Sequence, residues 1–373
     1  MIKKTLILIF TILAAASCVY PYSAELDSAR TLLVVDGDVI IGGTSEFDLS
    51  YVKTLGSGSA LLQQPFAELR LEGSDGSVFT GKCVAGHGSV DTGTADAAAN
   101  FKLFITMASG SYETDWMTPC SKPVIEGITF KVDESSLSVR FSCDSGGSHY
   151  VLYPVETWEY RSDLVASLLY EEPLFPGGTG AVREVDPKQA NHYCWKSSVM
   201  PQMLFRSGNP SEGRIREATV TAIPRTDKRI SYMYRISLEL RSISEGKYNW
   251  LSLLEKTSDN AGDLFAPTPS SIPGNVRCTS NPEEKVVGYV DATYSVRARR
   301  DISIREHNAF IGGGVSPEPV AVRNVNWFEK YQEGYLPLYK NEKEGNVYWI
   351  ESRCVDCRLA GGTTERPEDW PDL

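Results

Sequence analysis

Residues 232–241, YMYRISLELR, place an aromatic or aliphatic side chain at every second position, and this is the clearest period of two in the chain. A β-strand points successive side chains to opposite faces, so this pattern is typical of a strand with one buried face. The same alternation occurs at 66–73, FAELRLEG, and at 137–143, LSVRFSC. The sequence therefore predicts antiparallel sheets that each turn one face to a hydrophobic core.

One helix is expected directly after the strand at 232–241. Ser244 is a good N-cap, and apolar residues then recur at helical spacing until about Thr257. The following stretch, 267–273, contains three prolines, which remove backbone donors and favour an extended path across the surface. Cys278 is placed to pin this proline-rich loop through a disulfide.

The rest of the chain is expected to consist of strands and turns, so the predicted fold class is all-β. Two β-sandwich domains are expected, the first over 31–120, which is close to the usual size of such a fold. The second, over 121–373, would carry the short helix and the disulfide-pinned loop.

The N-terminus has the pattern of an export signal. Lys3 and Lys4 precede an apolar run at 6–13, and small residues follow up to Cys18, so 1–17 is predicted to be a signal peptide. A small-residue run that ends on cysteine resembles a bacterial lipobox. Cys18 is therefore expected to be acylated, and 18–30 to form a lipidated tether; plain secretion without a lipid is the alternative.

The net charge of −11 is unfavourable for binding a phosphate backbone, so no nucleic-acid partner is expected. No second apolar run approaches the length of a membrane span. Any attachment to a membrane would depend on the lipid at Cys18.

The cysteines after Cys18 are disulfide candidates if the chain is exported, and their odd number leaves at least one unpaired. They are Cys83, Cys120, Cys143, Cys194, Cys278, Cys354 and Cys357. The C-x-x-C at 354–357 could also form half of a zinc site with Cys194 and Cys278. Disulfides are the favoured interpretation, because an oxidising compartment promotes them.

A catalytic site is not evident. The string DSGG at 144–147 occurs around the nucleophile of trypsin-like proteases and directs attention to Ser145. However, Cys143 stands where a glycine is expected, and His87 is the only histidine upstream. A polar turn between two strands is the favoured interpretation.

Residues 156–160, ETWEY, set Glu156, Trp158 and Tyr160 on one strand face and Glu159 on the other. Two such acids do not by themselves make a glycosidase pair. The tryptophans could stack a sugar or a peptide, although core packing is the more usual role. No catalytic residue, cofactor or metal site is predicted.

Several segments resemble a known family. LVVDGDV at 33–39, YETDWMTP at 112–119, ETWEYRS at 156–162, the block from Gly274 to Gly288, and CVDCR at 354–358 are similar to outer-membrane lipoproteins of Bacteroidetes known as domain-of-unknown-function family 4249. The resemblance covers nearly the whole mature chain. It implies Ig-like β-sandwiches and a location at the outer membrane, with the membrane face left open.

Genes of this family commonly accompany TonB-dependent outer-membrane transporters. The resemblance therefore implies a non-enzymatic accessory or ligand-binding partner of such a transporter, and it supplies no catalytic residues. Cys194, Cys278, Cys354 and Cys357 occupy the family's cysteine positions and are the disulfide candidates that it implies. A structural or adhesive surface protein is the alternative, and a hydrolase is a third hypothesis.

Overall fold

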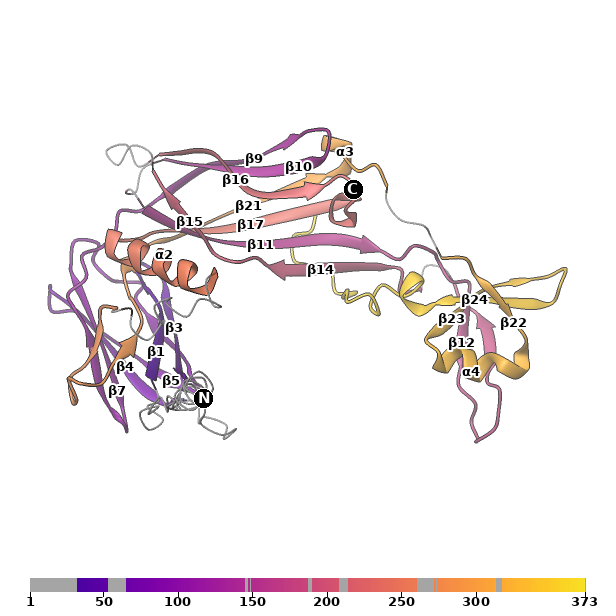
Figure 1. Ribbon diagram of the computed structural model, residues 1–373, viewed down its shortest axis with the longest axis horizontal. Coiled ribbons are helices and arrows are strands. Elements are labelled where there is room, and N and C mark those ends of the chain that lie inside the picture. Colours follow the sequence, from indigo (N-terminus) through magenta and orange to yellow (C-terminus); the bar gives the residue numbers. More distant parts are fainter. Residues whose placement is uncertain are drawn as a thin grey trace, which may run out of the picture.

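The computed structural model describes residues 32–52, 65–144, 147, 149–186, 190–207, 214–259, 272, 274–312 and 317–372. The predicted signal peptide, the tether with Cys18, Ser145 and most of the proline-rich loop lie outside these residues. The protein is mostly β and contains several sheets, which confirms the all-β fold class (Figure 1).

The N-terminal unit is built on a nine-stranded sheet with the order β18-β8-β7-β4-β5-β6-β3-β1-β19. Its strands are β1 (Leu32–Gly37), β3 (Thr44–Val52), β4 (Ala67–Gly73), β5 (Val78–Val84), β6 (His87–Asp91), β7 (Phe101–Met107), β8 (Gly110–Thr114), β18 (Val276–Cys278) and β19 (Val286–Val287). Beside it, β2 (Val39–Ile40) pairs in parallel with β20 (Ala292–Thr293).

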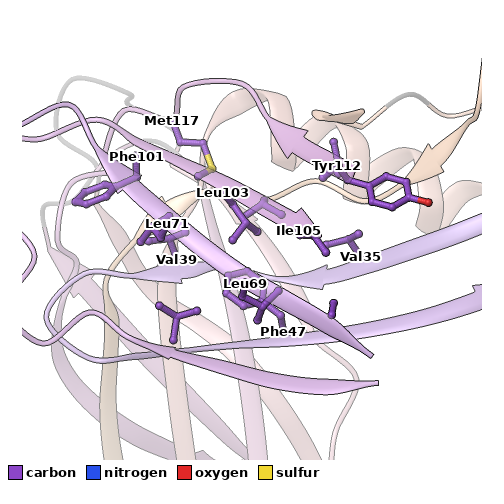
Figure 2. Close-up of a cluster of buried hydrophobic side chains, with 14 of the residues drawn as sticks. Val35, Val39, Phe47, Leu69, Leu71, Phe101, Leu103, Ile105, Tyr112 and Met117 are labelled. Atoms are coloured by element: carbon purple, nitrogen blue, oxygen red, sulfur yellow. The ribbon is translucent and has the colours of Figure 1, made fainter. Parts of the chain in front are cut away.

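The core of this unit confirms the alternation read at 66–73. In β4, Ala67, Leu69 and Leu71 are buried and the residues between them face outward. They pack with Phe47, Leu103 and other apolar side chains from neighbouring strands (Figure 2). Burial of these side chains is the main force that holds the unit together.

The central unit consists of two sheets that share one hydrophobic core. The first has the order β16-β10-β9, with β9 (Val124–Val132), β10 (Ser136–Asp144) and β16 (Ile215–Pro224). The second has the order β14-β11-β17-β21 with β15 also on β11, and its strands are β11 (His149–Arg161), β14 (Tyr193–Val199), β15 (Met203–Arg206), β17 (Met233–Ser242) and β21 (Ser295–Ser303).

The predicted strand faces of the central unit are confirmed. In β10, Leu137, Val139 and Phe141 are fully buried, and in β17, Tyr234, Ile236, Leu238 and Leu240 point into the same core. η2 (Lys228–Ile230) follows β16, and α3 (Ile304–His307) follows β21.

A distal unit lies at the end of the molecule opposite the N-terminal unit (Figure 1). It contains the pair β12 (Leu168–Glu171) and β13 (Ala181–Glu184), the sheet β22-β24-β23, and helices around Trp349. The remaining bounds are β22 (Val320–Val322), η4 (Asn324–Asn326), α4 (Trp327–Gln332), β23 (Tyr335–Asn341), β24 (Asn346–Glu351) and η5 (Ser352–Cys354).

The predicted helix is confirmed as α2 (Glu245–Asp259). The hydroxyl of Ser244 accepts a hydrogen bond from the backbone N–H of Lys247 at 3.1 Å, as expected of an N-cap. The expectation of a single helix is wrong, because the described residues also form α3 and α4. Both are short, so neither shows a helical period long enough to be recognised.

The predicted division at residue 120 differs from the structure. Strands β18, β19 and β20, from 276–293, return to the N-terminal unit, where β18 pairs with β8 and β19 with β1. Strands β18 and β19 lie at opposite ends of the nine-stranded order, although only residues 279–285 separate them along the chain. The sheet therefore curls around its core, and the returning segment covers both of its edges, which would otherwise expose unpaired backbone groups.

The returning segment begins at a close backbone approach. A Cβ at Gly274 would lie 1.6 Å from the carbonyl oxygen of Gly288, so only glycine fits there. Next to it, the side chain of Asn275 donates to the Val290 carbonyl at 2.7 Å and accepts from the Val290 N–H at 2.8 Å. The side-chain amide of Asn275 thus makes the two hydrogen bonds that a residue of a neighbouring strand would make, and these bonds fix the returning segment.

Candidate functional site

One strand of the central unit, β11, carries the residues from which we build the candidate site. Glu156, Trp158 and Tyr160 line one side of it, as the alternation at 156–160 predicts. On the neighbouring strand β14, Lys196 stands opposite Trp158 in the register, and Ser198 stands opposite Glu156. With Asp227, Lys228 and Arg229 at η2, these side chains line a cavity of about 420 Å³, here called the β11 pocket.

The two acidic side chains of the β11 pocket share one guanidinium, that of Arg229. Glu156 is buried and accepts hydrogen bonds from Arg229 at 2.9 and 3.1 Å and from the Tyr234 hydroxyl at 2.6 Å. Asp227 accepts two more from the same guanidinium, at 2.9 and 3.0 Å. Burial, and then the charge of Glu156, raise the pKa of Tyr234, so its hydroxyl stays protonated and donates.

Glu159 lies on the other face of the sheet, where it is buried and forms an ion pair with Arg161 at 2.7 Å. The two acids of ETWEY therefore do not face one another across a substrate position, as a glycosidase pair must. The alternation along the strand, as predicted for 156–160, therefore gives no such pair.

The basic side of the β11 pocket centres on Tyr160. The Lys196 nitrogen lies 3.9 Å from the centroid of its ring and the Lys228 nitrogen 6.0 Å from it. Lys228 forms an ion pair with Asp163. Lys196 instead donates to the backbone carbonyl of Ala360, and no ion pair joins it to a carboxylate of the described residues. Burial, together with the charge of Lys228, lowers the pKa of Lys196.

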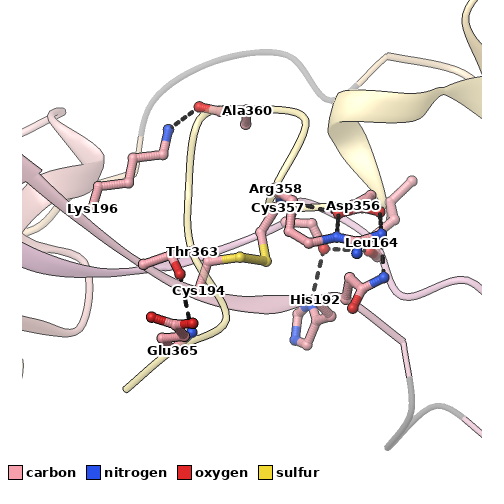
Figure 3. Close-up of a disulfide and its surroundings, with 12 residues drawn as sticks. Leu164, His192, Cys194, Lys196, Asp356, Cys357, Arg358, Ala360, Thr363 and Glu365 are labelled. Atoms are coloured by element: carbon pink, nitrogen blue, oxygen red, sulfur yellow. Dashed lines mark hydrogen bonds and ion pairs between the residues drawn. A yellow bond between two sulfur atoms is a disulfide. The ribbon is translucent and has the colours of Figure 1, made fainter. Parts of the chain in front are cut away.

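A disulfide holds the carbonyl that Lys196 contacts (Figure 3). Cys194, opposite Tyr160 in the register, is bonded to Cys357, 163 positions later. Beyond this bond the chain runs along β14, where Trp195 and Thr363 exchange two backbone hydrogen bonds of 2.8 and 2.9 Å. The C-terminal segment is thereby fixed beside the β11 pocket.

The other two disulfide candidates carry thiols. Cys354 is buried in a small apolar cluster with Leu338 and Ile350. Cys278 lies on β18, and its sulfur is 3.6 Å from a carboxylate oxygen of Glu284. The prediction that a disulfide at Cys278 pins the proline-rich loop is therefore wrong, since the pairing of β18 with β8 and the Asn275 side chain hold this segment.

The zinc hypothesis is also contradicted, because two of its four ligands, Cys194 and Cys357, are bonded to each other as a disulfide. Across the described residues, no three histidine, cysteine, aspartate or glutamate side chains gather as a metal site would require. The additional cysteines, Cys83, Cys120 and Cys143, are buried or half-buried thiols.

The protease hypothesis finds no support in the described residues. His87 lies on β6 of the N-terminal unit, where its ring contacts Asp48. The DSGG string begins at Asp144, at the end of β10 in the central unit. Ser145 itself is outside the described residues.

Sequence reasoning identified the pocket face of β11 but not Lys196 or Lys228. Lys196 follows Trp195 and Lys228 precedes Arg229, and neither lysine belongs to a motif that marks a binding site. They come together because β11 pairs with β14 and η2 packs beside them. In the part of the chain that the structure describes, no helix has the length and apolar character needed to cross a bilayer.

Comparison with known proteins gives one clear result. A protein-family model described as "Domain of unknown function (DUF4249)" matches residues 19–299, which include every residue that lines the β11 pocket. No curated protein matches the chain.

Among solved structures, a two fibronectin type-III domain segment from chicken tenascin is similar at 12% identity with a TM-score of 0.18. The match covers 58% of this chain and 92% of that one. A likeness this weak supports no argument about fold or function.

Proposed function

Because the chain belongs to the DUF4249 family, we propose that it is a non-enzymatic outer-membrane lipoprotein that acts as an accessory or ligand-binding partner of a TonB-dependent transporter. The lipid would be attached to Cys18, after removal of 1–17. In this proposal the two larger β units are Ig-like sandwiches that present binding surfaces above the membrane.

The observation that carries the binding role is the β11 pocket. Its aromatic and charged side chains stand on the paired strands β11 and β14 and at η2, and a disulfide fixes the segment beside it. Convergent polar groups around an aromatic surface in a cavity of this size are typical of small-molecule sites. Rigid elements also lower the entropy cost of holding a ligand.

The state of Glu156 favours binding over hydrolysis. Its carboxylate accepts two hydrogen bonds from Arg229 and one from Tyr234, so three of its roughly four lone pairs are occupied by groups of the protein. A general base has to reach the proton of a substrate or water. Turnover of a glycoside or ester that disappears in a folded Glu156→Gln variant would contradict the non-enzymatic role.

Membrane attachment is tested by comparing the native protein with Cys18→Ala by intact mass and membrane fractionation. We expect the native protein to gain the mass of acyl chains and to stay with the outer membrane, and the variant to become soluble. Ser17→Ala keeps the cysteine and serves as the control. An unacylated native protein in the soluble fraction would contradict the anchor.

The transporter partner is tested by purifying the tagged, lipidated protein from detergent-solubilised outer membranes. We expect a transporter barrel at a stoichiometric ratio, which is lost with Cys18→Ala. A structural or adhesive surface protein, the alternative, would keep its surface activity in cells that lack the barrel and would purify without one.

A further inference from the structure

We propose that the β11 pocket binds a carboxylate carried on a six-membered ring, with the carboxylate between Lys196 and Lys228 and the ring against Trp158. This inference rests on the proposed ligand-binding function and names the chemical class of the ligand.

The charges of the pocket point to an anion. Arg229 is shared between Glu156 and Asp227, and Lys228 faces Asp163. Lys196 remains, with the neutral carbonyl of Ala360 as its hydrogen-bond partner and a second ammonium close enough to lower its pKa. An anion between the two lysines would relieve their mutual repulsion and add an attraction to each.

The acidic side chains of the pocket favour a carboxylate over a phosphate. A guanidinium fork fits carboxylates and phosphates alike. The guanidinium of this pocket, Arg229, already donates to Glu156 and Asp227. Those two carboxylates would also repel a doubly charged anion more strongly than a singly charged one.

The ring is inferred from the aromatic surface. Trp158 and Tyr160 are two positions apart on one strand face, so their side chains lie roughly 7 Å from each other along the strand. The Lys196 ammonium covers the ring of Tyr160, so this ring is not open to a ligand ring. Trp158 is half-buried, packs on the core of the central unit and lines the cavity, where it offers an indole surface.

The Lys196 ammonium is held ready for a ligand. It is fixed between the Tyr160 ring and the Ala360 carbonyl, and the Cys194–Cys357 bond keeps Ala360 in place. Ser198, exposed and also lining the cavity, adds a hydroxyl for a further polar group of the ligand. Little side-chain entropy would then be lost on binding.

The test is isothermal titration of the full-length lipidated protein in detergent. Sodium glucuronate probes an acidic sugar and sodium benzoate an aromatic acid, while glucose, benzyl alcohol and inorganic phosphate serve as comparison ligands. We expect at least one of the two acids to bind, and its neutral counterpart to bind at least about tenfold more weakly, which corresponds to about 1.4 kcal/mol. Which acid binds decides between a sugar and an aromatic ring.

Lys196→Met and Lys228→Met should each weaken binding of the acid by about tenfold or more. Lys330→Met is the matched control, because Lys330 also lies over a tyrosine ring, at 3.8 Å from the centroid of Tyr335, but belongs to α4. It should leave the affinity unchanged. Near-ultraviolet circular dichroism shows whether each variant keeps its fold.

The proposal is overturned if neither acid binds up to about 10 mM, or if phosphate binds as tightly as the acids. It is also overturned if Lys196→Met, with its fold intact, binds as well as the native protein, or if Lys330→Met weakens binding equally. None of these results affects copurification with a transporter, so failure of this inference is distinct from failure of the proposed function.

Discussion

The side-chain nitrogen of Lys247 contacts the Asp38 carboxylate inside the protein, although 209 positions separate the two residues. Their side chains are only 5% and 1% exposed. The Asp38 carboxylate also faces Arg241 at 3.3 Å and accepts a hydrogen bond from the Asp291 N–H at 3.0 Å. This buried cluster joins α2 and β17 to the N-terminal unit. Although burial alone would lower the pKa of Lys247, the charge of Asp38 raises it.

Lys247→Met should lower the free energy of unfolding by about 3–5 kcal/mol, because it leaves the buried Asp38 carboxylate without its closest cation. Urea unfolding followed by circular dichroism measures the change. Arg353→Ala removes an exposed pair with Glu351 and should cost less than about 1 kcal/mol. Equal effects of the two substitutions would contradict a stabilising role for the buried pair.

Asn275→Ala should lower the free energy of unfolding by about 1–3 kcal/mol, since it removes two hydrogen bonds to Val290 and leaves those backbone groups without them. Asn275→Asp keeps the shape but loses the donor, so we expect a loss of similar size. Asn281→Ala, at an exposed turn, is the control. Stability close to native for both Asn275 variants would show that the amide does not fix the returning segment.

Replacing both Cys194 and Cys357 by serine should lower the free energy of unfolding by about 2–5 kcal/mol, because the bond closes a long loop in the unfolded chain. Hydrogen exchange should also increase at Thr363, which pairs with Trp195 beside the bond.

Cys354→Ser is the control for this disulfide, and it should keep the cross-link in peptide mapping without reductant. A peptide that joins Cys354 to either Cys194 or Cys357 in the native protein would contradict the pairing.

His307 should make the protein less stable in acid. Burial lowers the pKa of His307 below its ordinary value of 6.5, and its Nδ1 accepts a hydrogen bond from the Ala309 N–H at 2.8 Å, so the folded protein holds the neutral ring. Below pH 6.5 the unfolded chain takes up a proton that the folded chain resists. The stability contributed by the neutral ring is therefore complete above pH 6.5 and is lost as the pH falls toward the lowered pKa.

His307→Asn offers an acceptor in nearly the same place but does not titrate. Its free energy of unfolding should fall less steeply than that of the native protein between about pH 7 and 5. The free energy of unfolding of the variant should still fall somewhat with pH, because burial also lowers the pKa of His149 and of His192. Identical slopes in the two proteins would rule out a contribution from His307.

Local pattern was enough to predict several elements of the fold. The alternating side chains of β4, β10 and β17 identified each buried face, and Ser244 marked the start of α2. The same alternation placed Glu156, Trp158 and Tyr160 on one side of β11. These predictions succeed because side-chain direction along a strand and capping of a helix depend only on residues a few positions apart.

The sequence by itself determined that β4, β10, β11 and β17 form strands, which faces of β4, β10 and β17 are buried, and where the main helix begins. Only the tertiary structure decided that β18 and β19 close the N-terminal sheet, that Cys194 bonds to Cys357, and that Lys247 lies against Asp38. The same holds for the β11 pocket, whose lysines come from β14 and η2. The physical reason is that these contacts join residues far apart in the chain, and they form only when burial of the shared cores brings the strands together.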